Sequence, residues 1–140
     1  MTQHESRASL GPAELEHLVE LALDEAKKLG ADQAEVGASH DKGLSATARL
    51  GDVENLEYTS DRGIGITVYK DNCKGSASTS DVSEPAIREA VAKACTFATV
   101  TAADQYAGLA EADLMCAEVR NLDLDHEWNI DARQAIAPVS

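Results

Sequence analysis

The chain carries few side chains whose types and spacing could support catalysis. His126-Glu127 begins like the zinc-protease sequence His-Glu-x-x-His, but Ile130 stands where the second histidine is required. The remaining histidines, His4, His17 and His40, are not at ligand spacing from one another. A metal site needs several correctly spaced ligands, so the sequence predicts no metal site within this chain.

Nucleophilic side chains are present without an identifiable base. Four hydroxyl residues lie between Ser76 and Ser80, and no histidine is positioned by sequence to activate them. The only positive charges near Cys73 in the sequence are Lys70 and Lys74. Gly63-Ile-Gly65 lacks the third glycine and the following helix of a dinucleotide-binding loop, so its glycines are better explained by close strand packing. The residues alone therefore predict no catalytic centre.

The composition excludes several classes of protein. The chain has 140 residues with 12 Lys or Arg and 25 Asp or Glu, a formal charge of −13. Such an acidic chain is a poor nucleic-acid binder and a poor ligand for an anionic membrane, although it suits basic partners. No apolar run could span a bilayer, and the polar start is not a secretory signal, so a cytoplasmic location is predicted. Three widely spaced cysteines predict reduced, buried or half-buried thiols.

Two helices are predicted from apolar periodicity. The first begins at Gly11-Pro12 and ends at Gly30, and the second has Ser83 as its N-cap, with Pro85 in the first turn. The apolar stripe of the first helix is Leu15, Leu18, Val19, Ala22, Ala26 and Leu29, and that of the second is Ile87, Ala90, Val91, Ala94, Phe97 and Ala98.

Between the helices the period changes to two. Turn signals at Asp41–Gly43, Gly51-Asp52, Ser60–Gly63 and Asp71-Asn72 divide residues 31–80 into about five short strands. Strands at this spacing form an antiparallel meander, which needs a cover on one face. The predicted fold is therefore an α+β two-layer domain, with about five strands and two helices packed on one face.

The chain is predicted to have three parts. Residues 1–10 are a disordered tail, and residues 11–100 form the α+β domain. Residues 101–140 hold eight acidic and two basic residues and show weak periodicity. They are interpreted as an acidic connector and the start of a following region that is truncated, because the helix that begins near Asp131 has under two turns.

Several separate blocks of the sequence carry a family resemblance. They are Gly30-Ala-Asp-Gln-Ala-Glu-Val36, Arg49-Leu-Gly-Asp-Val-Glu-Asn-Leu-Glu57, Gly63-Ile-Gly-Ile-Thr-Val-Tyr69, Gly75-Ser-Ala-Ser-Thr79 and Leu122-Asp-Leu-Asp-His-Glu-Trp128. In this order, and together with the helix from Ser83, they resemble the N-terminal domain of the TldD/PmbA family, on its PmbA or TldE side.

The resemblance implies a role in an ATP-independent metallopeptidase system that acts on peptides and unfolded segments, and the family is also linked to modulation of DNA gyrase. It implies a heterodimer with a TldD-like subunit, or self-association, and zinc only in that TldD-like partner. This chain would be a non-catalytic N-terminal domain with no cofactor of its own. It stops before the family's β-rich C-terminal part.

Two other readings stay open at this point. The chain could be a stand-alone acidic binding or regulatory module without peptidase activity, for example one that engages a gyrase-like protein. It could also be an inert fragment of a disrupted reading frame.

The small-residue strand Gly75, Ser76, Ala77, Ser78 and Thr79 is the candidate site for peptide docking. A strand edge can bind an extended peptide through backbone hydrogen bonds, and small side chains allow close approach. The alternative is that a helix or the rest of the family's chain covers this strand.

Overall fold

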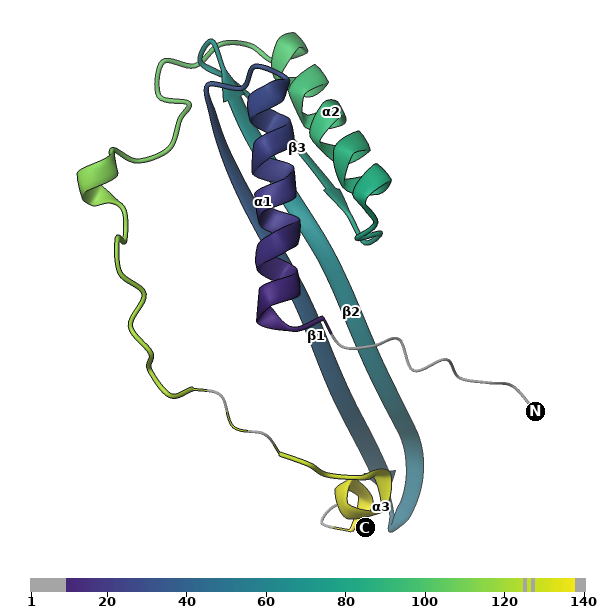
Figure 1. Ribbon diagram of the computed structural model, residues 1–140. Helices are drawn as coiled ribbons and strands as arrows, with labels where there is room; N and C mark the ends of the chain where they lie inside the picture. Colours follow the sequence, from purple (N-terminus) through teal and green to yellow (C-terminus); the bar gives the residue numbers. More distant parts are fainter. Residues whose placement is uncertain (1–9, 125, 127, 138–140) are drawn as a thin grey trace. The chain divides into compact units, whose positions relative to one another are not determined.

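The computed structural model describes residues 10–124, 126 and 128–137. Figure 1 shows the element order, which is α1 (Pro12–Lys28), β1 (Gln33–Arg49), β2 (Asp52–Lys70), β3 (Cys73–Thr79), α2 (Glu84–Val100), the single 3-10 turn η1 (Ala112–Leu114) and α3 (Ala132–Ile136). The three strands form one sheet in the order β1-β2-β3. The predicted combination of helices with an antiparallel sheet is confirmed.

The prediction of about five strands is wrong, because two of the four predicted turns do not reverse the chain. Residues 41–43 lie inside β1 and residues 60–63 lie inside β2. Between Gln33 and Thr79, the left-handed backbone that tight turns use occurs at Leu50 and Gly51 and again at Asp71 and Asn72, and at none of the residues in the two failed turns. Five predicted strands therefore merge into three.

The described residues fall into two compact units. One comprises the chain up to His40 together with Asp61–Leu109, and the other comprises Asp41–Ser60 with the residues from Ala110 onward. β1 and β2 each pass from one unit to the other, at the two turn-like sequences that were predicted to reverse the chain. The predicted border near residue 100 stays a prediction, and most of the predicted tail lies outside the described residues.

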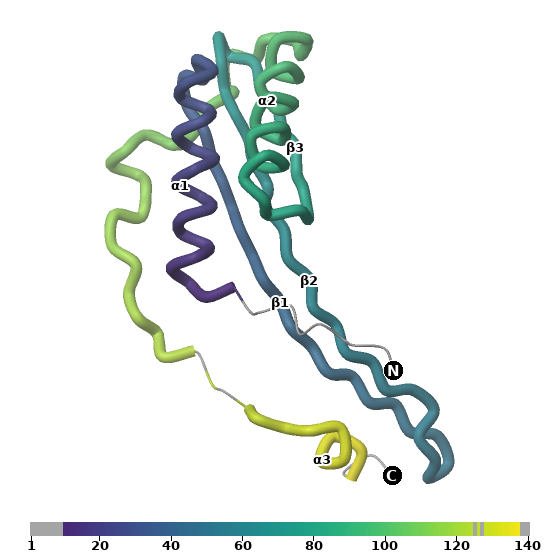
Figure 2. The backbone as a smooth tube through the Cα atoms, turned by 45° about the vertical axis from the view of Figure 1, so that its right-hand side comes forward, coloured from purple at the N-terminus to yellow at the C-terminus, as the bar shows by residue number. Residues whose placement is uncertain are grey.

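In the first unit, α1 and α2 lie side by side on one face of the sheet, as both views show (Figure 2). The core between the helices and the sheet is built from aliphatic residues, namely Ala22, Ala26, Ile64, Ile66, Val68, Ile87, Ala90, Val91, Ala94 and Ala98. The chain has one Trp, one Phe and three Tyr, and its core consists of Ala, Val and Ile.

Two residues of the predicted apolar stripes are exposed. Leu29 is the C-cap of α1 and lies beyond its last helical turn, where it is exposed. Phe97 is 49% exposed. A ring at this position finds no room under α2, because the backbone of that helix lies directly on β3 at Gly75.

The helix boundaries follow the predicted signals. Gly11 is the N-cap of α1, and its N–H donates to Glu14 Oε2 at 2.7 Å. Gly30 has a φ of +81°, which suits the residue that follows a helix C-cap. Ser83 is the N-cap of α2, as predicted, although its side chain makes no capping hydrogen bond.

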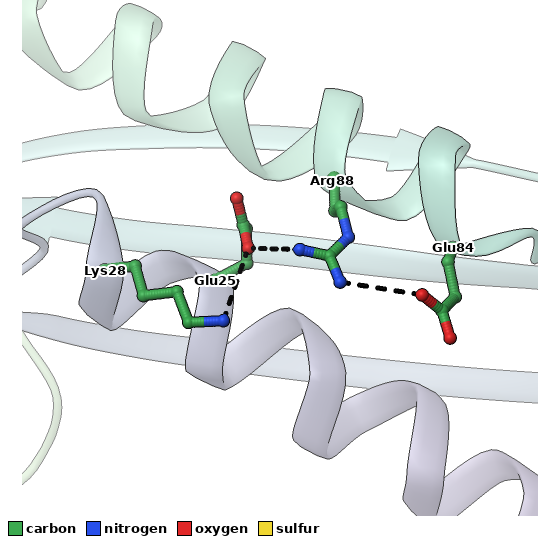
Figure 3. Close-up of polar contacts among 4 residues, drawn as sticks. All are labelled: Glu25, Lys28, Glu84 and Arg88. Atoms are coloured by element: carbon green, nitrogen blue, oxygen red, sulfur yellow. Dashed lines mark hydrogen bonds and ion pairs between the residues drawn. The ribbon is translucent and has the colours of Figure 1, made fainter.

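An ion-pair cluster joins the two helices (Figure 3). Arg88 of α2 donates to Glu25 Oε2 of α1 at 3.0 Å and lies 3.5 Å from Glu84 Oε2 of its own helix. Lys28 lies 4.0 Å from the same Glu25 oxygen. The Glu25 side chain is only 17% exposed, so this contact fixes the helices at a partly desolvated position.

Candidate functional site

The turn before β3 fixes the register of that strand. Asp71 and Asn72 have φ angles of 51° and 60°, as the central residues of a two-residue hairpin loop do. The loop sets Lys70 opposite Cys73, and the pairing continues to Ile64 opposite Thr79. The Asp71 N–H donates to Asp32 Oδ2 at 2.9 Å, which attaches the loop to the chain before β1.

The register determines which backbone groups of β3 face outward. A two-residue loop is closed by a hydrogen-bonded pair, so Lys70 and Cys73 exchange both backbone bonds, and every second pair along the ladder does the same. The Tyr69 carbonyl accepts from Asp32 N–H at 2.9 Å on the opposite side, as this alternation requires. It follows that the backbone groups of Lys74, Ser76 and Ser78 point away from β2.

These outward groups form an unpaired sheet edge within the described residues. β3 is the last strand in the sheet, and no hydrogen bond in that part of the chain reaches the backbone of Lys74, Ser76 or Ser78. The side chains of the same three residues are exposed. We call the outward backbone groups of Lys74, Ser76 and Ser78 the β3 edge.

The face of β3 toward α2 is closed by close backbone packing. Gly75 is buried, and a Cβ atom built there would overlap the carbonyl oxygen of Ala94 and the amide nitrogen of Ala98. The predicted close approach at Gly75 is therefore confirmed. Ala77 and Thr79 lie half-buried on the same face. The helix α2 covers one face of the candidate strand, and the outer edge of the strand is unpaired within the described residues. Peptide docking on this strand stays a prediction.

The hydroxyl residues of β3 show no nucleophile–base arrangement. The Ser76 hydroxyl lies 3.0 Å from the hydroxyl of Thr67, its partner residue on β2. The Thr79 hydroxyl donates to the Asp81 carbonyl at 3.3 Å and accepts from the Asp81 N–H at 3.0 Å. His40 Nδ1 accepts from the Leu10 N–H at 2.9 Å. These contacts are structural ones.

The thiols differ in their surroundings. Cys73 and Cys95 are half-buried, whereas Cys116 is exposed, contrary to the expectation that all three thiols are at least half-buried. Burial raises the pKa of the Cys95 thiol above its ordinary value, and the positive charge of Lys70 opposes this shift. A thiol with a raised pKa is a poor nucleophile at neutral pH.

The described residues offer no metal-ligand group. Within that part of the chain, no three side chains of His, Cys, Asp or Glu come together in a way that could hold a metal ion. His126 is exposed, and Glu127 lies outside the described residues. The described residues therefore do not fit the zinc associated with the resembled family. None of the helices in the described part of the chain has the length and apolarity that a bilayer crossing requires.

Comparisons with known proteins agree with the resemblance. Residues 34–98 match the family model for PmbA/TldA metallopeptidase domain 1. A metalloprotease PmbA homolog from Haemophilus influenzae is 45% identical over 122 residues, and metalloprotease PmbA from Escherichia coli O157:H7 is 42% identical over 122 residues. Each alignment covers 87% of this chain and 27% of the relative, so the chain spans about a quarter of the length of these curated relatives.

Two solved structures share the fold. A candidate modulator of DNA gyrase from Bacteroides thetaiotaomicron matches with a TM-score of 0.71 and 21% identity, covering 80% of this chain and 25% of that structure. TldE from Thermococcus kodakarensis matches with a TM-score of 0.58 and 19% identity, covering 63% of this chain and 20% of that structure.

Proposed function

We propose, from the premise that the chain belongs to the PmbA/TldD family and carries its first domain, that it is a non-catalytic domain of a PmbA/TldE-like subunit. In this proposal the subunit works in a metallopeptidase system in the cytoplasm, as a heterodimer with a TldD-like subunit or by self-association. Any zinc chemistry belongs to that TldD-like partner. The names of the relatives support the peptidase context.

The contribution that we propose for this domain is to bind an extended peptide or unfolded segment at the β3 edge. The observation that carries it is the outward orientation of the backbone groups of Lys74, Ser76 and Ser78. A strand that lies alongside these groups satisfies them with ladder hydrogen bonds, which do not depend on the peptide's sequence. Exposed serines at alternate positions leave space for its side chains.

The edge has few of the devices that usually block strand addition. Natural edge strands are protected by proline, bulges, inward charges or a covering loop. β3 contains no proline, pairs with β2 in an uninterrupted register, and carries one charged side chain, Lys74. Lys74 is also the one cation that this edge offers to an acidic peptide.

A proline substitution tests the proposal without disturbing the β2–β3 ladder. Ser76→Pro removes an N–H that faces outward, whereas Ala77→Pro removes one that β2 uses. Ser76→Ala is the matched control, because it removes the hydroxyl and keeps the N–H. The probe is a seven-residue peptide of alternating valine and threonine, and its binding is followed by NMR.

We expect Ser76→Pro to fold and to lose peptide binding, Ser76→Ala to bind like the wild type, and Ala77→Pro to lose the fold. Peptide binding that is unchanged in folded Ser76→Pro overturns the edge proposal. The subunit proposal has its own test, in which the chain is mixed with a TldD-like subunit from the same organism. Co-elution is expected, and hydrolysis of unfolded casein by the chain alone with added zinc contradicts it.

The alternative of a stand-alone acidic binding module rests on two observations. The chain has a formal charge of −13, and a candidate gyrase modulator shares its fold. Strong, salt-sensitive binding to a basic partner, together with no association with a TldD-like subunit, would favour this alternative.

A further inference from the structure

The hairpin of β1 and β2 ends in a two-stranded ribbon that belongs to the second unit. The ribbon comprises Asp41–Ser60. A Cβ atom built on Gly43 would stand 2.6 Å from the Thr59 hydroxyl, so these two residues share one face of the ribbon. Because side chains alternate along a strand, their neighbours Leu44 and Tyr58 share the other face.

The two faces of the ribbon differ in polarity. By the same alternation, the face of Leu44 and Tyr58 is apolar, and we call the following residues the ribbon face: Leu44, Ala46 and Ala48 of β1 with Leu56 and Tyr58 of β2. The opposite face carries mainly polar side chains, namely Ser45, Thr47, Arg49, Asn55, Glu57 and Thr59. In β1 the burial follows this division, because the three ribbon-face residues are half-buried and the residues between them are exposed.

The ribbon face leaves apolar surface in contact with solvent. Tyr58 is 66% exposed and Leu56 is 37% exposed. A two-stranded ribbon is marginally stable alone in water, and a further layer packed on its apolar face stabilises it. Apolar side chains that gather on an exposed face with a polar surround are typical of an interaction site. The ribbon face therefore fits a second layer of protein.

Opposite charges stand at the two ends of the ribbon face. Lys42 precedes Leu44 at the start of the ribbon, and Glu54 lies near its tip, both on the apolar side by the alternation. No ion pair engages Lys42 within the described residues, and Glu54 lies 3.8 Å from Arg49 in an exposed pair. In a two-fold interface, residue i of each copy contacts residue j of the other. A face with a cation at one end and an anion at the other is therefore complementary to itself when two copies pack antiparallel.

We propose that two copies of this chain associate through the ribbon face. The apolar side chains meet in the middle of the interface, and Lys42 of each copy pairs with Glu54 of the other copy. The inference names a surface for the self-association in the proposed function, and it rests on that part of the proposed function. It does not use the β3 edge, which lies in the other unit.

The first experiment is analytical ultracentrifugation of the whole chain over a wide range of protein concentration. We expect a reversible monomer–dimer equilibrium. Tyr58→Glu places a charge in the apolar centre of the interface and should weaken the dimer by about tenfold or more. Thr47→Glu is the matched control, because it adds the same charge to the opposite face and should dimerise like the wild type. A melting curve shows that each variant is folded.

The second experiment tests the pairing between copies. Lys42→Glu and Glu54→Lys each place like charges together at both ends of the interface, so each variant alone should dimerise more weakly than the wild type. An equimolar mixture of the two variants should dimerise more strongly than either alone, because opposite charges then meet at both ends. Such a recovery requires contact between two copies, since neither variant contains both substitutions.

Three results would each overturn the inference. They are a chain that stays monomeric at every concentration, a dimer that folded Tyr58→Glu leaves unchanged, and a mixture of the two charge variants that dimerises no better than either alone. Co-elution with a TldD-like subunit separates the two proposals. A monomeric chain that co-elutes with that subunit contradicts the inference alone, and a monomeric chain that does not co-elute contradicts the proposed function as well.

Discussion

Gly75 of β3 lies directly against the backbone of Ala94 in α2, so closely that even a methyl group at Gly75 would overlap the Ala94 carbonyl. This contact sets the distance between the helix layer and the sheet. It also holds β3 from one face, so that the β3 edge remains the side of the strand that is open within the described residues.

Replacing Gly75 should therefore destabilise the fold strongly for so small a change. Overpacking a core costs about 1–3 kcal/mol, and here the clash is with backbone, which cannot rotate away. We expect Gly75→Ala to lower the melting temperature by roughly 4–8 °C for each kcal/mol lost, measured by circular dichroism. Gly65→Ala is the control, because no atom lies within 4 Å of the position of its Cβ. Equal melting temperatures for the two variants would contradict the packing described here.

The tight turn before β3 gives a second prediction. Asn72 has a φ of 60°, which costs a β-branched residue roughly 1–2 kcal/mol and costs glycine little. We expect Asn72→Val to lower the free energy of unfolding by about that amount and Asn72→Gly to leave it nearly unchanged. Chemical denaturation of the two variants measures the difference. If Asn72→Val and Asn72→Gly have the same free energy of unfolding, the assignment of a two-residue turn is wrong, and so is the register of β3 that follows from it.

The sequence predicts both long helices and the tight turns at Gly51-Asp52 and Asp71-Asn72. The predicted division into strands is wrong. Asp41–Gly43 and Ser60–Gly63 contain turn-type residues, yet composition alone does not reverse a chain when no residue adopts left-handed backbone. Gly43 instead serves β1 by leaving room for a neighbour, since a Cβ there would stand 2.6 Å from the Thr59 hydroxyl. The pairing of β1 with β2 overrides the local turn propensity of these residues. The pattern of a single sequence does not show which residues of two strands pair.

For β3, the close packing could be predicted from the sequence, whereas the orientation of its backbone groups could not. The small residues of β3 indicated close approach at Gly75, but only the register shows which backbone groups of the strand face outward.

The link between the helices gives a third prediction. Glu25 is mostly buried and accepts from Arg88 at 3.0 Å, so removing the arginine leaves a partly desolvated carboxylate. We expect Arg88→Met to lower the free energy of unfolding by about 1 kcal/mol, since the Arg88 side chain is 44% exposed and screening limits the effect. Lys93→Met, which breaks an exposed pair with Glu89, should have a smaller effect. A double-mutant cycle with Glu25→Gln measures the coupling, and a coupling of zero refutes the link.

The Cys95 thiol gives a fourth prediction, on the pH dependence of stability. Burial raises its pKa, so the folded state prefers the protonated thiol. This contribution is present below the pKa of the unfolded thiol and is lost as the pH rises through the raised pKa of the folded state. We expect the stability of the wild type to fall relative to that of Cys95→Ala above about pH 8.5, in denaturation series at neutral and alkaline pH. Cys116→Ala, at an exposed thiol, should instead follow the wild type. A gain in the relative stability of the wild type at high pH would contradict this sign.

The most direct test of the central claim is amide hydrogen exchange along β3, with and without the valine–threonine peptide. In the free chain, the amides of Lys74, Ser76 and Ser78 should exchange quickly, and those of Cys73, Gly75 and Ala77 should be protected by the ladder with β2. The account predicts that the peptide slows exchange at those first three amides. If the peptide binds and these three amides still exchange at their free rates, β3 is not the edge that binds it.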